Sequence, residues 1–216
     1  MKLNPYYEIA TALRLDRGDG LFTDFRDRIE SLWCARPELA PFLDLLKKRF
    51  PSGPICSSYL MGWGRELFSF AIPTPDAIAT IAHRASSIVE IGAGTGYWSA
   101  LLSGAGVSVE AFDNRSWGLK PLWHDVKRGG AICAGRVDSK ALLLCWPPYR
   151  MPMAKRALQA FRGDLCVYVG EGYGGCTGSD GFHALLESEW VKEVVVHAVQ
   201  YPGLHDVVRI YRRKAI

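Results

Sequence analysis

Residues 88–99, Ile88-Val-Glu-Ile-Gly-Ala-Gly-Thr-Gly-Tyr-Trp-Ser99, decide the fold of this 216-residue chain. Apolar residues lead into Gly92, Gly94 and Gly96, and a helix is expected to begin near Tyr97. Residues 107–113 then predict a second strand, which ends in a carboxylate. The order of strand, glycine loop, helix, strand and acidic tip is typical of a nucleotide-binding half of an α/β sheet, in which glycine lets the backbone approach a ligand.

The spacing of the glycines disfavours a dinucleotide as the ligand. In the fingerprint Gly-x-Gly-x-x-Gly counted from Gly92, the third glycine position holds Tyr97, which is too bulky for close contact between helix and strand. Glu90 lies near the end of the first strand and Asp113 ends the second. These two carboxylates suit an amino-acid ammonium group and a ribose diol, respectively.

The segment Glu90-Ile-Gly-Ala-Gly-Thr-Gly96 resembles motif I of class I S-adenosylmethionine (SAM) dependent methyltransferases, and Asp113 matches the ribose-binding acid of that family. The resemblance implies that the glycines lie along the methionine and ribose of SAM and that Glu90 organises the loop and the amino group. The expected cofactor-binding residues are Phe70, Ile72, Glu90, Gly92, Ala93, Gly94, Thr95, Gly96, Trp98, Asp113, Asn114, Cys145 and Trp146. For Phe70 and Ile72 a plain core position is the alternative. For the whole motif the alternative is a glycine-rich turn of another α/β protein.

Composition is that of an ordinary folded domain, with 49% hydrophobic and 22% charged residues. No apolar run approaches the roughly 18 residues of a membrane span, and the amino terminus lacks the pattern of a secretory signal, so cytoplasmic residence is expected. The six cysteines form no Cys-x-x-Cys pair and the five histidines are scattered, so we expect free thiols and no metal site. The net charge of +4 is too small to indicate a nucleic-acid partner.

Residues 1–60 are expected to form a helical cap, and residues 61–216 the SAM-binding methyltransferase domain. Apolar residues recur at helical spacing over 25–33 and again over 39–50, and Pro37 fits the start of the second helix. The proline and glycine residues of 51–54 then break the pattern. Such a cap often covers substrate.

Strands alternate with helices through the rest of the chain. A helix capped by Asp76 precedes the first core strand, a short strand is expected within 117–136, and further strands are expected over 141–145, 165–169, 191–198 and 206–211. Helices are expected over 151–162 and 179–188. The pattern predicts an α/β fold in three layers with a mostly parallel, seven-stranded sheet. Its ending resembles the antiparallel last strand of the Rossmann-like class I methyltransferases.

The segment Cys145-Trp-Pro-Pro-Tyr-Arg150 follows a buried strand, where ligands of α/β sheets collect. It resembles the Asp/Asn-Pro-Pro-Tyr motif of amino-methyltransferases, but Trp146 replaces the polar residue that accepts hydrogen bonds from the target amine. An indole donates a hydrogen bond and accepts none, so methylation of an adenine or cytosine amine is in doubt. Trp146 and Tyr149 are the candidates for acceptor placement, and packing of a rigid loop onto the cap is the alternative.

A glycine-rich loop over 170–180 follows the next strand and suggests close approach of a ligand or a moving lid. Glu171 is the candidate for orienting or deprotonating the acceptor, and anchoring of the loop is its alternative role. Thr177 and Asp180 have the spacing of a capping box. His205 is expected to be a surface residue of a turn.

The predicted function is a SAM-dependent methyltransferase that acts on an unidentified small molecule or RNA. Positioning supplies much of the catalysis in methyl transfer, so the missing catalytic triad is not an objection. The segments also resemble a methyltransferase-like group with a Cys-Trp-Pro-Pro-Tyr motif and no assigned acceptor. One alternative is a catalytically inactive SAM-binding sensor or partner protein. Another is a nucleic-acid-binding module that uses the basic clusters, with Trp63, Trp123 and Trp146 as stacking surfaces.

Overall fold

A seven-stranded sheet with the strand order β3-β2-β1-β4-β5-β7-β6 forms the centre of the molecule. The computed structural model describes residues 3–15 and 24–215. The strands are β1 (Ser87–Ile91), β2 (Ser108–Asp113), β3 (Val126–Arg128), β4 (Ala141–Cys145), β5 (Leu165–Gly170), β6 (Trp190–His197) and β7 (Val207–Arg213). The strands expected from the sequence are therefore present, including the short one within 117–136.

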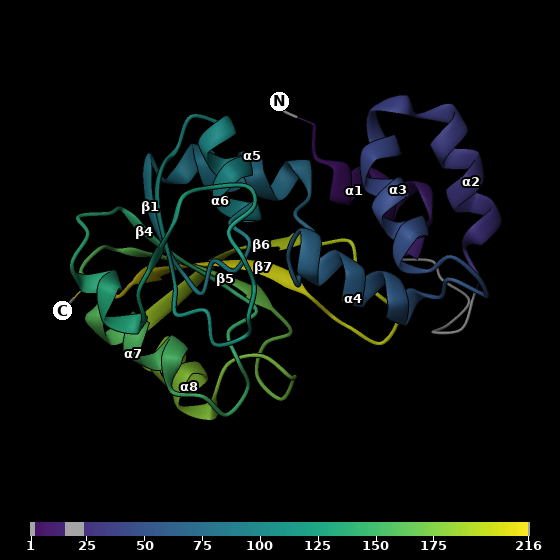
Figure 1. Cartoon of the computed structure of the whole chain (residues 1–216). Helices are drawn as coiled ribbons and strands as arrows, with labels where there is room; N and C mark the ends of the chain where they lie inside the picture. Colours follow the sequence, from purple (N-terminus) through teal and green to yellow (C-terminus); the bar gives the residue numbers. More distant parts are fainter. Residues whose placement is uncertain (1–2, 16–23, 216) are drawn as a thin grey trace.

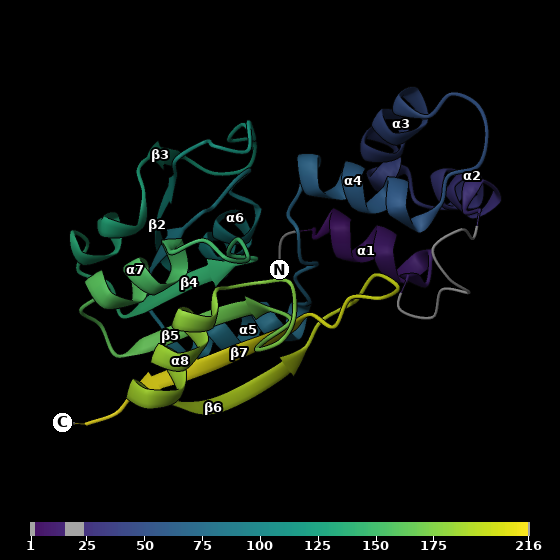
Figure 2. The ribbon, with the colours of Figure 1, turned by 90° about the horizontal axis from the view of Figure 1, so that it is seen from below.

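The direction of the last strand agrees with the sequence prediction. Strand β7 runs antiparallel to both β5 and β6, and all other neighbouring strands pair in parallel. Figure 2 shows β4 and β6 pointing towards the amino-terminal helices and β7 pointing away from them. The carboxyl ends of β1, β2 and β4 consequently meet at one edge of the sheet, where the loops that follow them lie together.

Helices cover both faces of the sheet and give the expected three layers. Helices α5 (Pro75–Arg84) and α6 (Tyr97–Gly104) lie on one face, and α7 (Met153–Ala160) and α8 (Asp180–Glu189) on the other (Figure 1). Alternate residues of the central strands serve the two faces, since Leu143 packs in the cluster that includes α5 and Leu142 in the cluster that includes α7. Burial on both faces explains why these strands are almost continuously apolar.

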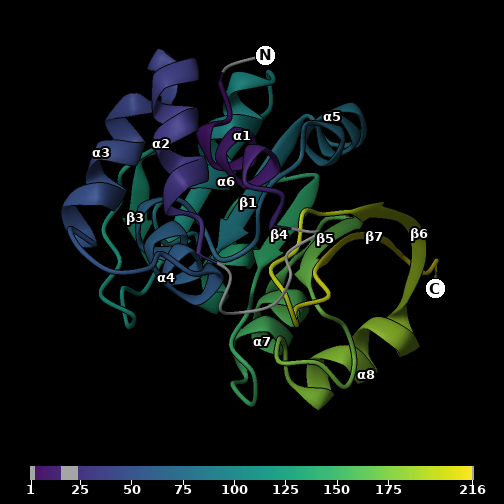
Figure 3. The same cartoon turned by 90° about the vertical axis from the view of Figure 1, so that its right-hand side faces the viewer.

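Before α5, the described residues form four α-helices and a short 3-10 helix. They are α1 (Pro5–Ala12), α2 (Arg26–Ala35), η2 (Pro37–Leu39), α3 (Ala40–Arg49) and α4 (Ser57–Leu67). We call α1–α4 the cap. Seen from the side in Figure 3, the cap lies in front of β1 and β3, whereas β6 and α8 are to one side of it. The predicted division after residue 60 falls inside α4 and stays a prediction.

Buried hydrogen bonds and aromatic contacts join the cap to the sheet domain. The hydroxyl of Tyr97, in the first turn of α6, donates to Asn4 Oδ1 at 2.7 Å and accepts from the backbone N–H of Tyr6 at 3.2 Å. The ring of Tyr6 stacks on Phe68 with 4.9 Å between the centroids. Because residues of the cap and of α5, α6 and the sheet form one continuous hydrophobic cluster, the cap is packed as part of the same core.

Two helix caps differ from the sequence predictions. Thr74, and not Asp76, caps α5, because its hydroxyl accepts from the N–H of Ala77 at 3.1 Å. Ser179 caps α8 in place of Thr177, whose hydroxyl instead contacts Tyr168 and the N–H of Glu171. In both cases the extended residue next to the helix supplies the cap, as the geometry of N-caps requires.

Among residues 3–15 and 24–215, no helix combines the length and the apolar character needed to cross a membrane. Within the same ranges no three His, Cys, Asp or Glu side chains are grouped as metal ligands would be.

Candidate active site

A cavity of about 800 Å³ lies beyond the carboxyl ends of β1, β2 and β4. This volume is within the range of roughly 300–1,000 Å³ that is usual for small-molecule sites. The predicted site residues that line it are Phe70, Glu90, Gly92, Ala93, Gly94, Thr95, Trp98, Asp113, Asn114, Cys145, Trp146 and Tyr149. Three other predicted site residues, Ile72, Gly96 and Glu171, are not part of the lining.

The glycine loop takes a backbone conformation that few other residues adopt. Its φ angles are +80° at Gly92, +53° at Gly94 and +80° at Gly96. A Cβ at Gly92 would lie 3.2 Å from Met153 Cε, and one at Gly94 would lie 3.1 Å from Leu119 Cδ1. Since both of these side chains also line the cavity, the missing Cβ atoms leave room inside it.

Gly96 has a different reason for being a glycine. A Cβ there would lie 2.9 Å from both His124 Cβ and Val126 Cγ2, so the residue lets the chain before β3 pack on the start of α6. Ile72 is also structural in position, because it is fully buried and forms an isolated β-bridge with Val199. A direct contact of either residue with a ligand stays a prediction.

Asp113 joins the end of β2 to the glycine loop. Its Oδ2 accepts a hydrogen bond from the N–H of Gly94 at 3.0 Å, and its Oδ1 accepts from the N–H of Arg115. The carboxylate lines the cavity and is only half-buried. It therefore presents a fixed pair of acceptor oxygens beside the loop, as recognition of a diol requires.

Glu90 is the most deeply buried carboxyl group of the cavity wall, with an exposed fraction of 1%. Burial raises its pKa to about 7, although a hydrogen bond donated by the hydroxyl of Ser99 opposes this shift. A carboxyl with a pKa near neutrality is poised to become fully ionised when a cation binds next to it. This position suits an ammonium group of a ligand.

Trp146 forms a rigid aromatic wall of the cavity. Its φ of +49° is a rare backbone conformation for a bulky residue, and its N–H donates to the carbonyl of Val169 at 2.9 Å. The indole stacks on Phe70 with 5.2 Å between the ring centroids. Its Nε1 donates to Asp206 Oδ1 at 2.8 Å, so the only hydrogen-bonding atom of the ring is already in use.

Asp206 was not predicted from the sequence as part of this arrangement. Its exposed fraction is only 3%, and burial raises its pKa to about 6, against a lowering by the hydrogen bond from Trp146. Its neighbour His205 projects into solvent, as expected for a residue of a surface turn. The sequence shows that neighbouring side chains of a strand point in opposite directions, but it does not show which of the two is buried.

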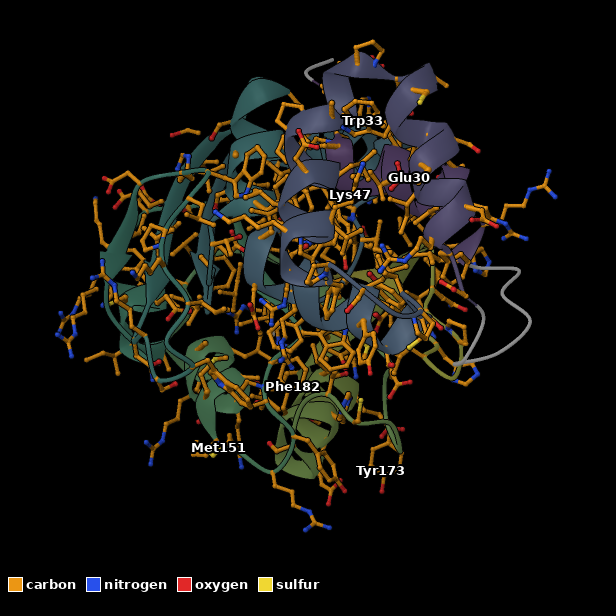
Figure 4. The ribbon with its side chains drawn as sticks, turned by 45° about the vertical axis from the view of Figure 1, so that its right-hand side comes forward. Glu30, Trp33, Lys47, Met151, Tyr173 and Phe182 are labelled. Atoms are coloured by element: carbon orange, nitrogen blue, oxygen red, sulfur yellow. The ribbon has the colours of Figure 1, made fainter. Side chains whose placement is uncertain are left out.

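The rim of the cavity carries exposed apolar and aromatic side chains. Tyr149 is 45% exposed and Trp117 is 66% exposed, and both line the cavity. Met151 belongs to the same rim. Figure 4 shows Met151 and Tyr173 at the end of the molecule opposite to the cap residue Trp33.

Glu171 is bound to its own loop and lies outside the cavity lining. Its Oε2 accepts from the N–H of Cys176 at 2.8 Å, and its Oε1 accepts from the N–H of His205 at 3.0 Å. Although burial opposes the shift, these hydrogen bonds lower its pKa. The loop also contacts the segment after β4, because the N–H of Gly178 donates to the carbonyl of Pro147 at 2.8 Å. This geometry favours the anchoring role for Glu171, and its role towards an acceptor stays a prediction.

Several residues of the lining were not singled out by the sequence. They include Arg65, Trp117, Leu119, Met153, Arg156 and Cys176. Arg65 comes from the glycine-spaced end of α4, a helix of the cap. Its position in the cavity depends on how α4 crosses the end of the sheet, which no local pattern of residues indicates.

No protein-family model matches the sequence, and no curated protein is significantly similar to it. Among solved structures, it is similar to a 1,6-didemethyltoxoflavin-N1-methyltransferase of Burkholderia thailandensis bound to S-adenosylhomocysteine, with 18% identity, a TM-score of 0.44, and coverage of 64% of this chain and 77% of that chain. For N-methyltransferase NodS from Bradyrhizobium japonicum, identity is 9%, the TM-score is 0.48, and the match covers 65% of this chain and 94% of that chain. For a putative O-methyltransferase from Klebsiella pneumoniae, identity is 12%, the TM-score is 0.47, and the match covers 80% of this chain and 96% of that chain. These likenesses are distant, since each has an identity below 20% and a TM-score below 0.5.

Proposed function

We propose that the chain is a SAM-dependent methyltransferase that acts on a small molecule or on RNA. The observation that carries this proposal is that the glycine loop, Glu90 and Asp113 line one cavity at the carboxyl edge of the sheet. This edge is where ligands of open α/β sheets bind. The proposal is supported by the overlap between the motif and the cavity lining, which covers residues 90–95 and Asp113 and leaves out Gly96.

The residues present fit such a cofactor. The loop of Gly92 and Gly94 leaves space that a Cβ would fill, Glu90 supplies a buried carboxyl group for an ammonium, and Asp113 supplies acceptors for a ribose diol. When bound, SAM supplies a methyl group that is already activated on a sulfonium. Trp98, Asn114 and Cys145 complete the proposed wall around it.

In this proposal, the aromatic side chains of the cavity wall and rim position the methyl acceptor. Trp146 and Phe70 present stacked rings, and Tyr149 stands beside them at the open side. Ring faces of this kind attract a nearby cation by about 0.5–2 kcal/mol and orient a planar substrate. Correct orientation of the two reactants provides much of the rate enhancement of such a displacement. Glu171 contributes indirectly, because it holds the backbone of Cys176, a lining residue.

The test is binding of SAM and S-adenosylhomocysteine, measured by isothermal titration calorimetry. We expect Asp113→Ala to weaken both ligands by about tenfold or more, since a hydrogen bond to a charged group contributes roughly 1.5–3 kcal/mol. Asp125→Ala is the matched control, because Asp125 is an exposed acid outside the cavity lining. Absence of binding to the unaltered protein would refute the proposal.

Transfer of label from methyl-labelled SAM into fractionated cell extract tests catalysis and identifies the acceptor class. Label in nucleic acid supports RNA, and label in the low-molecular-weight fraction supports a small molecule. Label that reaches the same fraction at an unchanged rate with Asp113→Ala would contradict the ribose assignment.

A catalytically inactive SAM-binding protein is the second candidate. The observation that favours it is that Trp146 stands where a polar residue would accept from the target amine, and its only polar atom is bonded to Asp206. Tight binding of SAM without transfer to any fraction would select this candidate.

A further inference from the structure

Arg65 is a half-buried cation on the wall of the cavity. It lies in the last turn of α4, and its guanidinium carbon is 5.4 Å from the centroid of the Phe70 ring. Across the described ranges 3–15 and 24–215, the structure records this ring contact for the side chain but no hydrogen bond and no ion pair. The guanidinium, which has five N–H donors in a fixed planar arrangement, therefore lies at the cavity wall without an acceptor from the described part of the protein.

In the part of the chain that the structure describes, the other half-buried arginines have acceptors. Arg209 donates to the carbonyl of Gly170 at 2.8 Å, and Arg213 donates to the carbonyl of Phe161 at 2.7 Å. The carboxylate next to Arg65 in the sequence, Glu66, is paired with Arg49 instead. The missing acceptor for Arg65 is therefore a property of its position on the cavity wall.

Filling the cavity with a ligand removes water from this guanidinium. A charged group that loses water without gaining a partner is costly, so a ligand that fits here is expected to bring an anionic oxygen. The guanidinium matches the planar geometry of carboxylate and phosphate groups. Phe70 also contacts the rings of Trp146 and Trp117, at centroid distances of 5.2 Å and 6.3 Å, so the cation borders a continuous aromatic wall.

We propose that Arg65 binds a carboxylate or phosphate group of a small ligand in this cavity. This anion has two sources, the amino-acid end of the proposed cofactor or the acceptor, and the first source rests on the proposed function. The position of Arg65 on the cap means that one helix of the cap takes part in selecting the ligand.

The first arm of the experiment examines the cofactor as the source. S-adenosylhomocysteine carries a carboxylate, whereas 5′-methylthioadenosine shares its adenosine thioether and has no amino-acid end. If the cofactor is the source, Arg65→Met weakens S-adenosylhomocysteine by about tenfold or more and leaves 5′-methylthioadenosine unchanged in calorimetry. Arg65→Lys, which keeps the charge and loses the planar fork, is expected to have an intermediate effect.

The second arm examines the acceptor as the source. Benzoate and inorganic phosphate are titrated into the complex with S-adenosylhomocysteine, as probes of a planar carboxylate and of a phosphate. If the acceptor is the source, one of them binds the unaltered protein and its affinity falls about tenfold or more with Arg65→Met. Arg162→Met is the control, since Arg162 is exposed and does not line the cavity.

A selective loss in either arm, with Arg162→Met unchanged, supports the proposal. Unchanged affinities in both arms overturn it, and so does equal weakening of the two adenosine ligands. Thermal unfolding of each variant shows whether it is folded. If Arg65→Met does not fold, Arg65→Lys is used in its place in both arms. If the unaltered protein binds neither adenosine ligand, the proposed function fails, while benzoate and phosphate titrated into the free protein still test Arg65.

Discussion

The indole Nε1 of Trp146 donates a 2.8 Å hydrogen bond to Oδ1 of Asp206, a carboxylate that is 60 residues away in the sequence. This bond joins the loop after β4 to the residue that precedes β7. It holds the indole against Phe70 while the backbone of Trp146 takes a positive φ. The shape of the cavity wall thus depends on a residue that does not line the cavity.

Asp206→Leu is expected to lower the free energy of unfolding by about 1–3 kcal/mol, because it leaves a part-buried indole N–H without its acceptor. Asp206→Asn keeps an acceptor oxygen and is expected to stay close to the unaltered protein. Urea unfolding measures both variants. If Asp206→Leu is as stable as Asp206→Asn, the hydrogen bond does not contribute to the free energy of unfolding.

The pH dependence of stability is expected to reflect Glu90. Its folded-state pKa of about 7 is above the ordinary value of 4.5, so the folded protein binds this proton more tightly than the unfolded chain does. Its contribution to the free energy of unfolding is therefore greatest below about pH 4.5 and is lost as the pH rises to about 7. At roughly 1.4 kcal/mol per pH unit, the loss amounts to about 3 kcal/mol.

Glu90→Gln removes this titration and is expected to flatten the fall in stability between pH 5 and pH 8, measured by urea unfolding at several pH values. Glu187→Gln is the control, since Glu187 is exposed on α8. An identical pH profile for Glu90→Gln and the unaltered protein would show that Glu90 ionises normally.

Gly96→Ala is expected to destabilise the protein by about 2–4 kcal/mol, the sum of left-handed backbone strain and overpacking against His124 and Val126. Gly203 is a matched control, because its φ of +81° is almost the same and nothing lies within 4 Å of its missing Cβ. Gly203→Ala should therefore cost only about 1–2 kcal/mol. Equal losses in chemical denaturation would mean that the close contacts of Gly96 do not matter.

Tyr97→Phe is expected to weaken the attachment of the cap and to lower the free energy of unfolding by about 1–2 kcal/mol. It deprives the buried N–H of Tyr6 of its acceptor and Asn4 of a donor. Tyr173→Phe is the control, because the Tyr173 side chain is 78% exposed.

Unfolding followed by far-UV circular dichroism and by tryptophan fluorescence should give one coincident transition for the unaltered protein, since cap and sheet share a core. Two separate transitions would contradict that shared core.

Local patterns were sufficient to predict the sheet and the part of the site formed by the glycine loop. Apolar runs, glycines and the carboxylate of Asp113 are contiguous signals, and parallel strands bring their carboxyl ends to one edge. Glu90, Gly94 and Asp113 consequently line one cavity, as expected. The third strand was harder to define because it has only three residues and no periodicity.

The residues that were missed depend on contacts between distant elements. Arg65 reaches the cavity only because α4 crosses the end of the sheet, and Asp206 meets Trp146 only because β7 lies beside β5. The place of Glu171 after a strand predicts a role towards the acceptor or in anchoring the loop, whereas the hydrogen bond from the N–H of Cys176 depends on the turn of that loop. Such encounters are set by tertiary packing, which leaves no mark on the neighbouring residues in the sequence.

The shared core of cap and sheet also bears on how molecules enter and leave. A movement of α1 away from the sheet would separate Tyr6 from Phe68 and expose both rings to water. This exposure costs a free energy of about 25 cal/mol for each Å² of apolar surface. We therefore expect ligands to enter and leave past the exposed rim residues Trp117, Tyr149 and Met151, while the cap stays in place. A large molecule can then insert one protruding group past this rim while the rest of the molecule stays outside the cavity.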